Sequence, residues 1–376
     1  MGVTKGYYQR VTTRNFANVF SRELSGYEEK VPNFTLYESV LDLVNEKYYG
    51  DINYLDVLYG SIKGAVAGLG DPYTSFSTPE ENQAFFTDLE GIYEGVGVEI
   101  DFVGDRLLVI APLEGSPAKE AGLLPKDEIV AIDGRAVMGM DLYSVLALIR
   151  GPRGSRVILT IYREGSEELK DFTVTRGVIH TESVGVTMRD GVAVMRITKF
   201  GGDTEQLFDK AVNQIVREGA KGVVLDLRNN PGGYLDVAVK VANEFLDGGL
   251  IVEERFKDGK VTPFTADGDG KLSELPVVVL VDAGSASAAE IVAGALRDNN
   301  RAKIVGENTY GKGSVQEVEE FGDGSALRIT IAHWYTPGGS PISGKGIKPD
   351  ILVRYTGGDT DTQLERALSE IKKIIQ

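Results

Sequence analysis

Two predominantly apolar runs in the C-terminal half of the chain, the first with a single charged residue (Asp226), constrain its fold more than any other feature. They span residues 222–227 and 277–281, and each leads through a glycine-bearing turn into a helical pattern. A strand that is apolar on both faces needs cover on both faces, which a parallel sheet between helices provides. We therefore predict an α/β layer architecture with a largely parallel sheet in this part of the chain.

The other parts of the chain have different patterns. Apolar residues recur at helical spacing between residues 34 and 68, and Thr78-Pro79-Glu80-Glu81 has the composition of a helix start. Short strands and glycine turns follow before the apolar runs begin. The predicted parts are an arm (1–32), a helical N-terminal domain (33–91), a domain of short strands (92–176), a strand–helix core (177–356) and a C-terminal helix (357–376).

Composition and length exclude several classes of protein. A chain of 376 residues is too long for one ordinary hydrophobic core, so several domains are expected. The formal net charge of −16 disfavours nucleic acid or an anionic membrane surface as the main partner. No apolar run approaches the roughly 20 residues that span a bilayer. The lack of cysteine excludes thiol chemistry, disulfides and cysteine metal sites.

A serine in the segment 284–290 is the candidate nucleophile. Ser287 follows the apolar run 277–281 and precedes a helical pattern, so it is expected at a strand-to-helix turn. The unpaired N–H groups of the helix start favour a negative charge that develops there. Two alternatives stay open. Ser287 and Glu290 also match a capping box, in which the serine only caps the helix, and Ser285 is a competing nucleophile.

A lysine in the segment 309–316 is the candidate base. The chain has only two histidines, His180 and His333, which disfavours a histidine-based triad without excluding it. Lysine can activate a serine if burial lowers its pKa from about 10.4 to roughly 7–8. In an extended segment Lys312 and Gln316 lie on one face, so Gln316 could bond and orient the neutral amine. The alternative is an ordinary solvent-exposed lysine.

Paired glycines supply the candidate oxyanion hole. Residues 226–233 read Asp-Leu-Arg-Asn-Asn-Pro-Gly-Gly and follow the first apolar run. Without a Cβ, Gly232 and Gly233 can turn their N–H groups toward a ligand. With the amide of Ala288, one of them could hold an oxyanion, and position favours Gly233. The alternative is an ordinary turn between a strand and a loop.

Residues 92–176 resemble a PDZ domain of the bacterial, protease-associated kind. The matching segments are 95–98 (Gly-Val-Gly-Val), 115–118 (Gly-Ser-Pro-Ala), 121–123 (Ala-Gly-Leu) and 127–134 (Asp-Glu-Ile-Val-Ala-Ile-Asp-Gly). The resemblance implies β-augmentation by a peptide, whose terminal carboxylate meets a glycine-rich loop. That loop is predicted at Tyr93, Glu94, Gly95, Val96 and Gly97. The alternative is a hairpin in which the glycines only serve turn geometry.

The chain as a whole, from about residue 34 to 350, resembles the carboxyl-terminal processing (tail-specific) serine proteases. Besides the segments above, the matching motifs are Asp-Pro-Tyr-Thr-Ser at 71–75, Tyr-Thr-Pro-Gly-Gly at 335–339 and Gly-Ile-Lys-Pro-Asp at 346–350. The resemblance implies a multidomain α/β and α+β fold with a crotonase-like protease core, an inserted PDZ domain and a helical N-terminal region. It also implies that Ser287 is the nucleophile, that Lys312 is its base and that Gln316 positions the lysine.

The resemblance further implies what the protein does. It predicts a serine endopeptidase that needs no metal or cofactor and cleaves proteins near apolar C-terminal tails. The PDZ domain would bind the tail and gate the active site, with Arg150 as a candidate participant. The implied location is extracytoplasmic, in the periplasm or cell envelope, with a leader or anchor missing from this sequence. A homodimer and an adaptor or activator protein are open as partners. The rival interpretations are a non-catalytic peptide-binding scaffold and an acyl-transfer or thioester enzyme on the same core.

Overall fold

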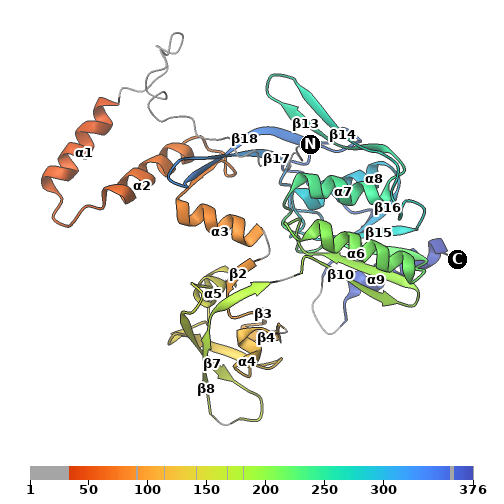
Figure 1. The fold of residues 1–376 in the computed structure, drawn as a ribbon, viewed down its shortest axis with the longest axis horizontal. Coiled ribbons are helices and arrows are strands. Elements are labelled where there is room, and N and C mark those ends of the chain that lie inside the picture. The colour runs from red at the N-terminus through yellow and green to blue at the C-terminus, as the bar shows by residue number, and fades with distance from the viewer. Residues whose placement is uncertain are drawn as a thin grey trace. The chain divides into compact units, whose positions relative to one another are not determined.

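The computed structural model describes residues 34–89, 92–113, 115–140, 142–166, 168–180, 182–355 and 360–375 (Figure 1). The expected N-terminal arm lies outside these residues. Two compact units account for the chain. The larger, here the core unit, contains the residues up to Phe85 together with Thr187–Phe200 and Gln214–Gln376. The smaller, here the small unit, contains Phe86–Val186 and Gly201–Asn213.

The parallel sheet predicted from the apolar runs is present in the core unit. Its strands follow the order β10-β11-β12-β15-β16-β19, and every pair from β11 onward is parallel. β12 and β15, the two apolar runs, are buried at every position. The strands are β10 (Val184–Arg189), β11 (Val192–Ile197), β12 (Gly222–Asp226), β15 (Val277–Val281), β16 (Ala302–Gly306) and β19 (Ile351–Leu352).

Helices cover both faces of this sheet. On one face, Leu368 and Ile371 of the C-terminal helix pack against alternate strand residues such as Val224 and Val278. The intervening residues, Leu225 among them, are fully buried as well, so the other face is also covered. Across the part of the chain that the structure describes, no helix has the length and apolar content needed to cross a membrane. The helices of the core unit here are α7 (Leu235–Phe245), α8 (Ala288–Asp298) and α9 (Thr362–Ile375), while most of α6 (Thr204–Arg217) is assigned to the small unit.

A second, antiparallel sheet completes the core unit. Its order is β1-β18-β13-β14, and β17 also pairs with β18. In this sheet β1 pairs with β18 in the register Ser75↔Arg328, so it joins segments that are far apart in the sequence. The sequence predicted none of these pairings. The strands are β1 (Ser75–Ser77), β13 (Gly249–Phe256), β14 (Val261–Ala266), β17 (Ser314–Glu320) and β18 (Ala326–Tyr335).

Three helices precede the small unit's sheet in the chain, as the apolar spacing predicted. They are α1 (Thr35–Lys47), α2 (Tyr54–Ala67) and α3 (Pro79–Leu89). The predicted start of α3 is a capping box, because Thr78 N donates to Glu81 Oε2 over 2.9 Å and Glu81 N donates to Thr78 Oγ1 over 3.3 Å. β1 lies between α2 and α3, so this helical segment is anchored in the antiparallel sheet of the core unit.

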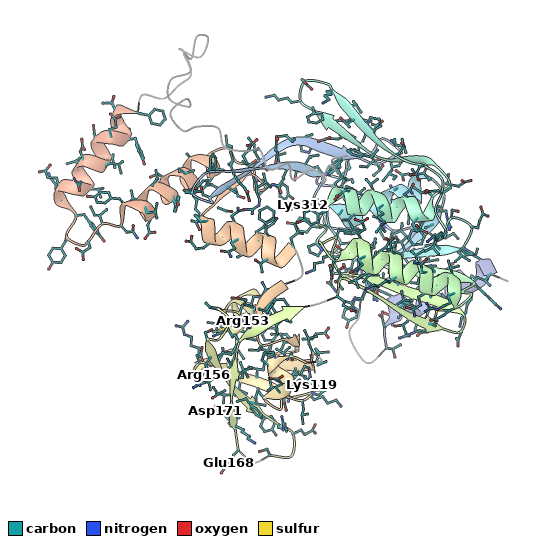
Figure 2. All side chains as sticks on the ribbon, viewed as in Figure 1. Lys119, Arg153, Arg156, Glu168, Asp171 and Lys312 are labelled. Carbon is teal, nitrogen blue, oxygen red and sulfur yellow. The ribbon has the colours of Figure 1, made fainter. Side chains whose placement is uncertain are left out.

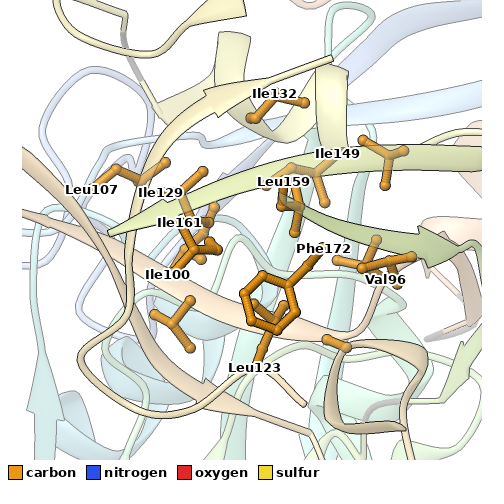
Figure 3. Close-up of a cluster of buried hydrophobic side chains, with 14 of the residues drawn as sticks. Val96, Ile100, Leu107, Leu123, Ile129, Ile132, Ile149, Leu159, Ile161 and Phe172 are labelled. Carbon is orange, nitrogen blue, oxygen red and sulfur yellow. The ribbon is translucent and has the colours of Figure 1, made fainter. Parts of the chain in front are cut away.

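The small unit is built on the antiparallel sheet β3-β4-β5-β7-β8, in which β6 pairs with β5. Leu123, Leu159, Ile161 and Phe172 meet in one fully apolar cluster beneath it (Figure 3). Among the described strands, β3 has β4 as its single neighbour and is an edge strand. The elements are β2 (Ile92–Gly95), β3 (Val98–Val103), β4 (Arg106–Pro112), α4 (Pro117–Glu120), β5 (Glu128–Ile132), β6 (Arg135–Ala136), α5 (Leu142–Ile149), β7 (Arg156–Tyr162), β8 (Lys170–Thr175) and β9 (Gly177–His180).

Candidate active site

Ser287 occupies the predicted turn between β15 and α8, in a backbone conformation that is unusual for serine. Its φ is 53°, a region that side-chain-bearing residues rarely adopt and that often marks functional sites. The neighbouring loop comes close: a Cβ placed on Gly232 would lie 2.7 Å from Ser287 Cβ and 2.9 Å from Ala288 N. Only glycine fits at position 232, so the chain brings bare backbone against the candidate nucleophile.

The competing serine, Ser285, has a structural role. It is fully buried, and its Oγ donates to the carbonyl oxygen of Leu227 over 2.8 Å. The same Oγ accepts from Asp282 N over 3.0 Å. These bonds tie the turn before α8 to the end of β12, and they use the hydroxyl that a nucleophile would need.

Glu290 joins the serine segment to the lysine segment. Its carboxylate is fully buried, and Oε2 accepts from Ser287 N over 2.8 Å and from Lys312 N over 2.9 Å. Oε1 accepts from Gly311 N over 2.7 Å and from the Thr309 hydroxyl. Burial raises the pKa of Glu290, while these four hydrogen bonds act in the opposite direction and favour the carboxylate.

The sequence predicted only one of these four contacts. The bond from Ser287 N is the reciprocal half of the capping box. The other three join α8 to residues 309–312, and nothing in the local pattern of α8 indicates them. The available signal was that Glu290 is the first charged residue of the helix, in a stretch of small and apolar residues where a charge needs buried partners.

Lys312 lies half-buried just before β17, on the core unit (Figure 2). Its Nζ is 5.8 Å from the centroid of the Tyr73 ring. Burial lowers the pKa of Lys312, and the positive charge of the Arg328 guanidinium lowers it further. Both effects favour the neutral amine, which is the form that can accept a proton.

Gln316 lies in β17, and its side chain has a partner that the sequence did not indicate. Its Nε2 donates to the carbonyl oxygen of Tyr73. A bond between Gln316 and the Lys312 amine stays a prediction. The bond that is present leaves Oε1 as the end of the amide that could accept from an amine.

The three candidate oxyanion donors are not equivalent in the structure. Gly232 N donates to Asn230 Oδ1 over 2.9 Å, so this amide is already committed to the fold of its own loop. A Cβ on Gly233 would lie 2.1 Å from the carbonyl oxygen of Phe200, so only glycine fits there too. Ala288 is the first residue of α8 and is buried. The bond of Gly232 N argues for Gly233 with Ala288 over Gly232, and the oxyanion hole stays a prediction.

The predicted carboxylate loop of the small unit lies mostly in a strand. Tyr93, Glu94 and Gly95 belong to β2, which pairs with β9. Val96 is fully buried, and its carbonyl oxygen accepts from Ala118 N over 2.8 Å. Gly97 has a φ of 73°, and a Cβ there would lie 2.5 Å from Ser116 Cβ. A peptide-binding role for these five residues stays a prediction.

The remaining candidates do not add to this site. His333 is exposed on β18, opposite Ser314 of β17. Within the described ranges, no group of three His, Asp or Glu side chains could hold a metal ion. The residues that the structure brings together are therefore Ser287, Glu290 and Lys312, with Gln316 beside them.

Comparisons with known proteins agree with this geometry. Residues 191–353 match the profile of peptidase family S41, and residues 108–163 match that of a PDZ domain. The chain is 41% identical over 323 residues to a probable CtpA-like serine protease of Staphylococcus aureus strain MRSA252. That alignment covers 85% of this chain and 65% of the relative, so the chain spans about two thirds of that protein's length. A Staphylococcus haemolyticus relative of the same description is 40% identical over 312 residues, covering 82% of this chain and 62% of the relative.

Solved structures give the same assignment. The photosystem II D1 C-terminal processing protease is 32% identical, with a TM-score of 0.56, and the match covers 85% of this chain and 86% of that one. A putative S41 protease from Bacteroides fragilis has a TM-score of 0.59 over 87% of this chain and 93% of that one, and at 19% identity it shows the shared fold alone. The chain belongs to peptidase family S41 and contains a PDZ domain.

Proposed function

We propose that this protein is a serine endopeptidase in which Ser287 is the nucleophile and Lys312 is its general base. The observation that carries the proposal is the shared acceptor: one carboxylate oxygen of Glu290 receives the backbone N–H groups of both residues. A nucleophile and its base must lie within reach of each other, and this carboxylate fixes their two backbones against one atom.

Lys312 can act as the base because its surroundings favour the neutral amine. Burial lowers its pKa, with a further contribution from Arg328. In the first step, Ser287 Oγ attacks the peptide carbonyl carbon and its proton passes to Lys312 Nζ. The resulting ammonium then gives that proton to the leaving amine, which leaves an acyl-enzyme on Ser287.

The amides of Gly233 and Ala288 support the step in which charge develops. When the carbonyl carbon becomes tetrahedral, its oxygen becomes an oxyanion that needs N–H donors. Ala288 N lies at the N-terminus of α8, where the helix dipole also favours negative charge. Water then attacks the acyl-enzyme while Lys312 takes its proton. The acyl–Oγ bond breaks, the ammonium returns the proton to Ser287 Oγ, and the product leaves with a new carboxylate.

The substrates that we propose are proteins with apolar C-terminal tails, which the small unit binds. Among the described strands its edge strand β3 has β4 as its single neighbour, so a peptide could add to it as a further strand, the usual mode of a PDZ domain. In the same unit the Arg150 guanidinium carbon lies 5.3 Å from the centroid of the Tyr93 ring, close to the proposed carboxylate loop. We further propose that tail binding gates the reaction, and that the protein works outside the cytoplasm.

Mass spectrometry of cleavage products tests this function. A disordered protein with an apolar C-terminal tail is incubated with the wild type, with Ser287→Ala and with Ser285→Ala. We expect cleavage by the wild type and by a folded Ser285→Ala variant, and none by Ser287→Ala. Undiminished cleavage by Ser287→Ala would contradict the proposal. If the wild type binds this tail and other tails but cleaves none of these proteins, the non-catalytic scaffold is favoured.

A further inference from the structure

The motif Asp-Pro-Tyr-Thr-Ser at residues 71–75 has no role in the mechanism above, yet the structure places it against the base. Tyr73 makes two contacts there. Its ring centroid lies 5.8 Å from Lys312 Nζ, and its carbonyl oxygen accepts from Gln316 Nε2. One residue from the N-terminal segment therefore touches both the candidate base and the residue beside it.

The backbone of this motif is held firmly in place. Asp71 Oδ1 accepts from Tyr73 N over 3.0 Å, and its Oδ2 accepts from the Thr74 hydroxyl over 2.6 Å. The buried Thr74 Oγ1 also accepts from Thr330 N of β18 over 3.1 Å. Thr330 in turn pairs with Gln316 in the β17–β18 ladder. The motif is thus locked to the same strands that carry Gln316.

We propose that Tyr73 is a positioning residue for the base: its ring shields Lys312 Nζ from water, and its carbonyl group fixes the side-chain amide of Gln316. This inference rests on the proposed function of Lys312.

The groups that surround Lys312 are consistent with this role. Arg328 on β18 acts on the Lys312 amine, and Glu290 on α8 accepts from the Lys312 backbone N–H. The phenol of Tyr73, whose ring lies near the amine, is itself affected by Tyr310, Glu290 and Asp71. Burial raises the pKa of the Tyr73 phenol, so this ring is uncharged near neutral pH. The ring can then exclude water from the amine without adding an opposing negative charge.

The test compares Tyr73→Phe, Tyr73→Leu and Tyr73→Ala. A matched control is Tyr59→Leu, because Tyr59 is another aromatic residue of the N-terminal segment, packed on Phe76 with ring centroids 5.8 Å apart. Two readouts are used. The first is the pH dependence of Lys312 acetylation by a trace reagent, measured by mass spectrometry in a Ser287→Ala background. The second is the pH profile of kcat/KM for peptide cleavage, with kcat and KM separated.

We expect Tyr73→Phe to behave like the wild type and Tyr73→Ala to raise the midpoint of the Lys312 titration. Tyr73→Ala should also lower kcat at neutral pH by about 10–100-fold, with a smaller change in KM. The Lys312 midpoint of Tyr73→Leu should lie between those of Tyr73→Phe and Tyr73→Ala. Tyr59→Leu should leave the Lys312 midpoint unchanged.

Two outcomes separate this inference from the function it rests on. If the titration midpoint of Lys312 is low in the wild type and equally low in Tyr73→Ala, the proposed role of Tyr73 is overturned. The proposed role of Lys312 as the base then still stands. An ordinary lysine midpoint in the wild type, with cleavage intact in Lys312→Ala, would overturn the proposed base and the inference together.

Discussion

The two sheets of the core unit contribute different halves of the candidate site. The parallel sheet delivers Ser287 at the end of β15 and the Gly232–Gly233 turn after β12. The antiparallel sheet delivers Lys312 and Gln316 at the start of β17. Glu290 is the buried group that hydrogen-bonds to both halves.

The two halves depend on the sequence in different ways. The serine half arises from short-range patterns, an apolar run followed by a glycine-bearing turn and a helix. The lysine half depends on contacts across long separations, such as Gln316 to Tyr73 and Thr330 to Thr74. The serine half also uses a long-range contact, from Ser285 to Leu227, but a local sequence pattern marks its position. No local pattern marks the partners of the lysine half.

The largest effect is expected where the two halves meet. Glu290→Gln replaces one of two acceptor oxygens with an NH2 group, which cannot receive the buried N–H donors. We expect a loss of roughly 2–4 kcal/mol in the free energy of unfolding, since buried donors lose their partner. Cleavage should fall by about 100-fold or more, because Ser287 and Lys312 lose their common anchor. Urea unfolding and kcat/KM measure the two effects.

The control for this change is Glu319→Gln, which alters a partly exposed carboxylate on β17. It should change stability by no more than about 0.5 kcal/mol and leave cleavage as it is. If Glu290→Gln behaved like this control, Glu290 would not link the two halves.

A charge change tests the lysine half alone. Arg328 is buried, donates to Ser77 Oγ over 2.6 Å and lowers the pKa of Lys312. Arg328→Gln removes that positive charge, so the pKa of Lys312 should rise and less of the amine should be neutral at a given pH. Cleavage should fall roughly tenfold near neutral pH and recover as the pH is raised.

The pH profile of kcat/KM measures this shift, and the mutant's acidic limb should lie at higher pH than that of the wild type. If kcat/KM instead falls by the same factor at all pH values, Arg328 only stabilises the sheet.

A third change separates stability from function in the same half. The folded chain lowers the pKa of Lys312, so at every pH below the ordinary lysine value the folded state carries a cost for the charged amine. Between the folded and unfolded pKa values the unfolded chain binds more protons, so the free energy of unfolding rises with pH. Lys312→Met removes this cost and should raise stability near neutral pH by roughly 1 kcal/mol while abolishing cleavage.

Thermal unfolding at several pH values checks this prediction. The gain from Lys312→Met should shrink as the pH approaches the ordinary lysine value. A gain that is the same at every pH would show that packing, and not the charge, is responsible.

The smallest effect concerns the serine half. Arg228, which precedes the glycine turn, bonds Asp226 of β12 and Asp361 next to α9, with N–O distances of 2.7 and 2.8 Å. Asp361→Ala should lower the free energy of unfolding by about 1 kcal/mol. This pair is worth more than a fully exposed one because Arg228 is mostly buried, although Asp361 is partly exposed. Lys372→Ala, on α9, breaks an exposed ion pair with Asp190 in the turn between β10 and β11, and should lower the free energy of unfolding by less than about 0.5 kcal/mol. Urea unfolding measures both variants. Equal losses of stability in Asp361→Ala and Lys372→Ala would contradict the view that the partly buried ion pair stabilises the fold more than the exposed one.

The sequence predicted the parallel sheet well because its strands are marked by local apolar runs. β12 and β15 lie where the apolar runs placed them, and α8 begins directly after Ser287. The pairing of β1 with β18 and the β13–β14 hairpin were missed, because short alternating strands carry no local mark of their partners. The same limit applies to the site: Ser287 and Lys312 could be nominated, but the links through Glu290 and Tyr73 span segments that only the fold brings together.

The central claim is that residues from two sheets form one reaction centre, and a double-mutant cycle tests it most directly. The kcat/KM for peptide cleavage is measured for the wild type, Ser287→Ala, Lys312→Ala and the double variant. Each single change should cost on the order of 10³-fold or more, and the double variant should be no worse than either one, because the two residues act in the same step. Losses that multiply in the double variant, or a Lys312→Ala variant that cleaves normally, would contradict the account.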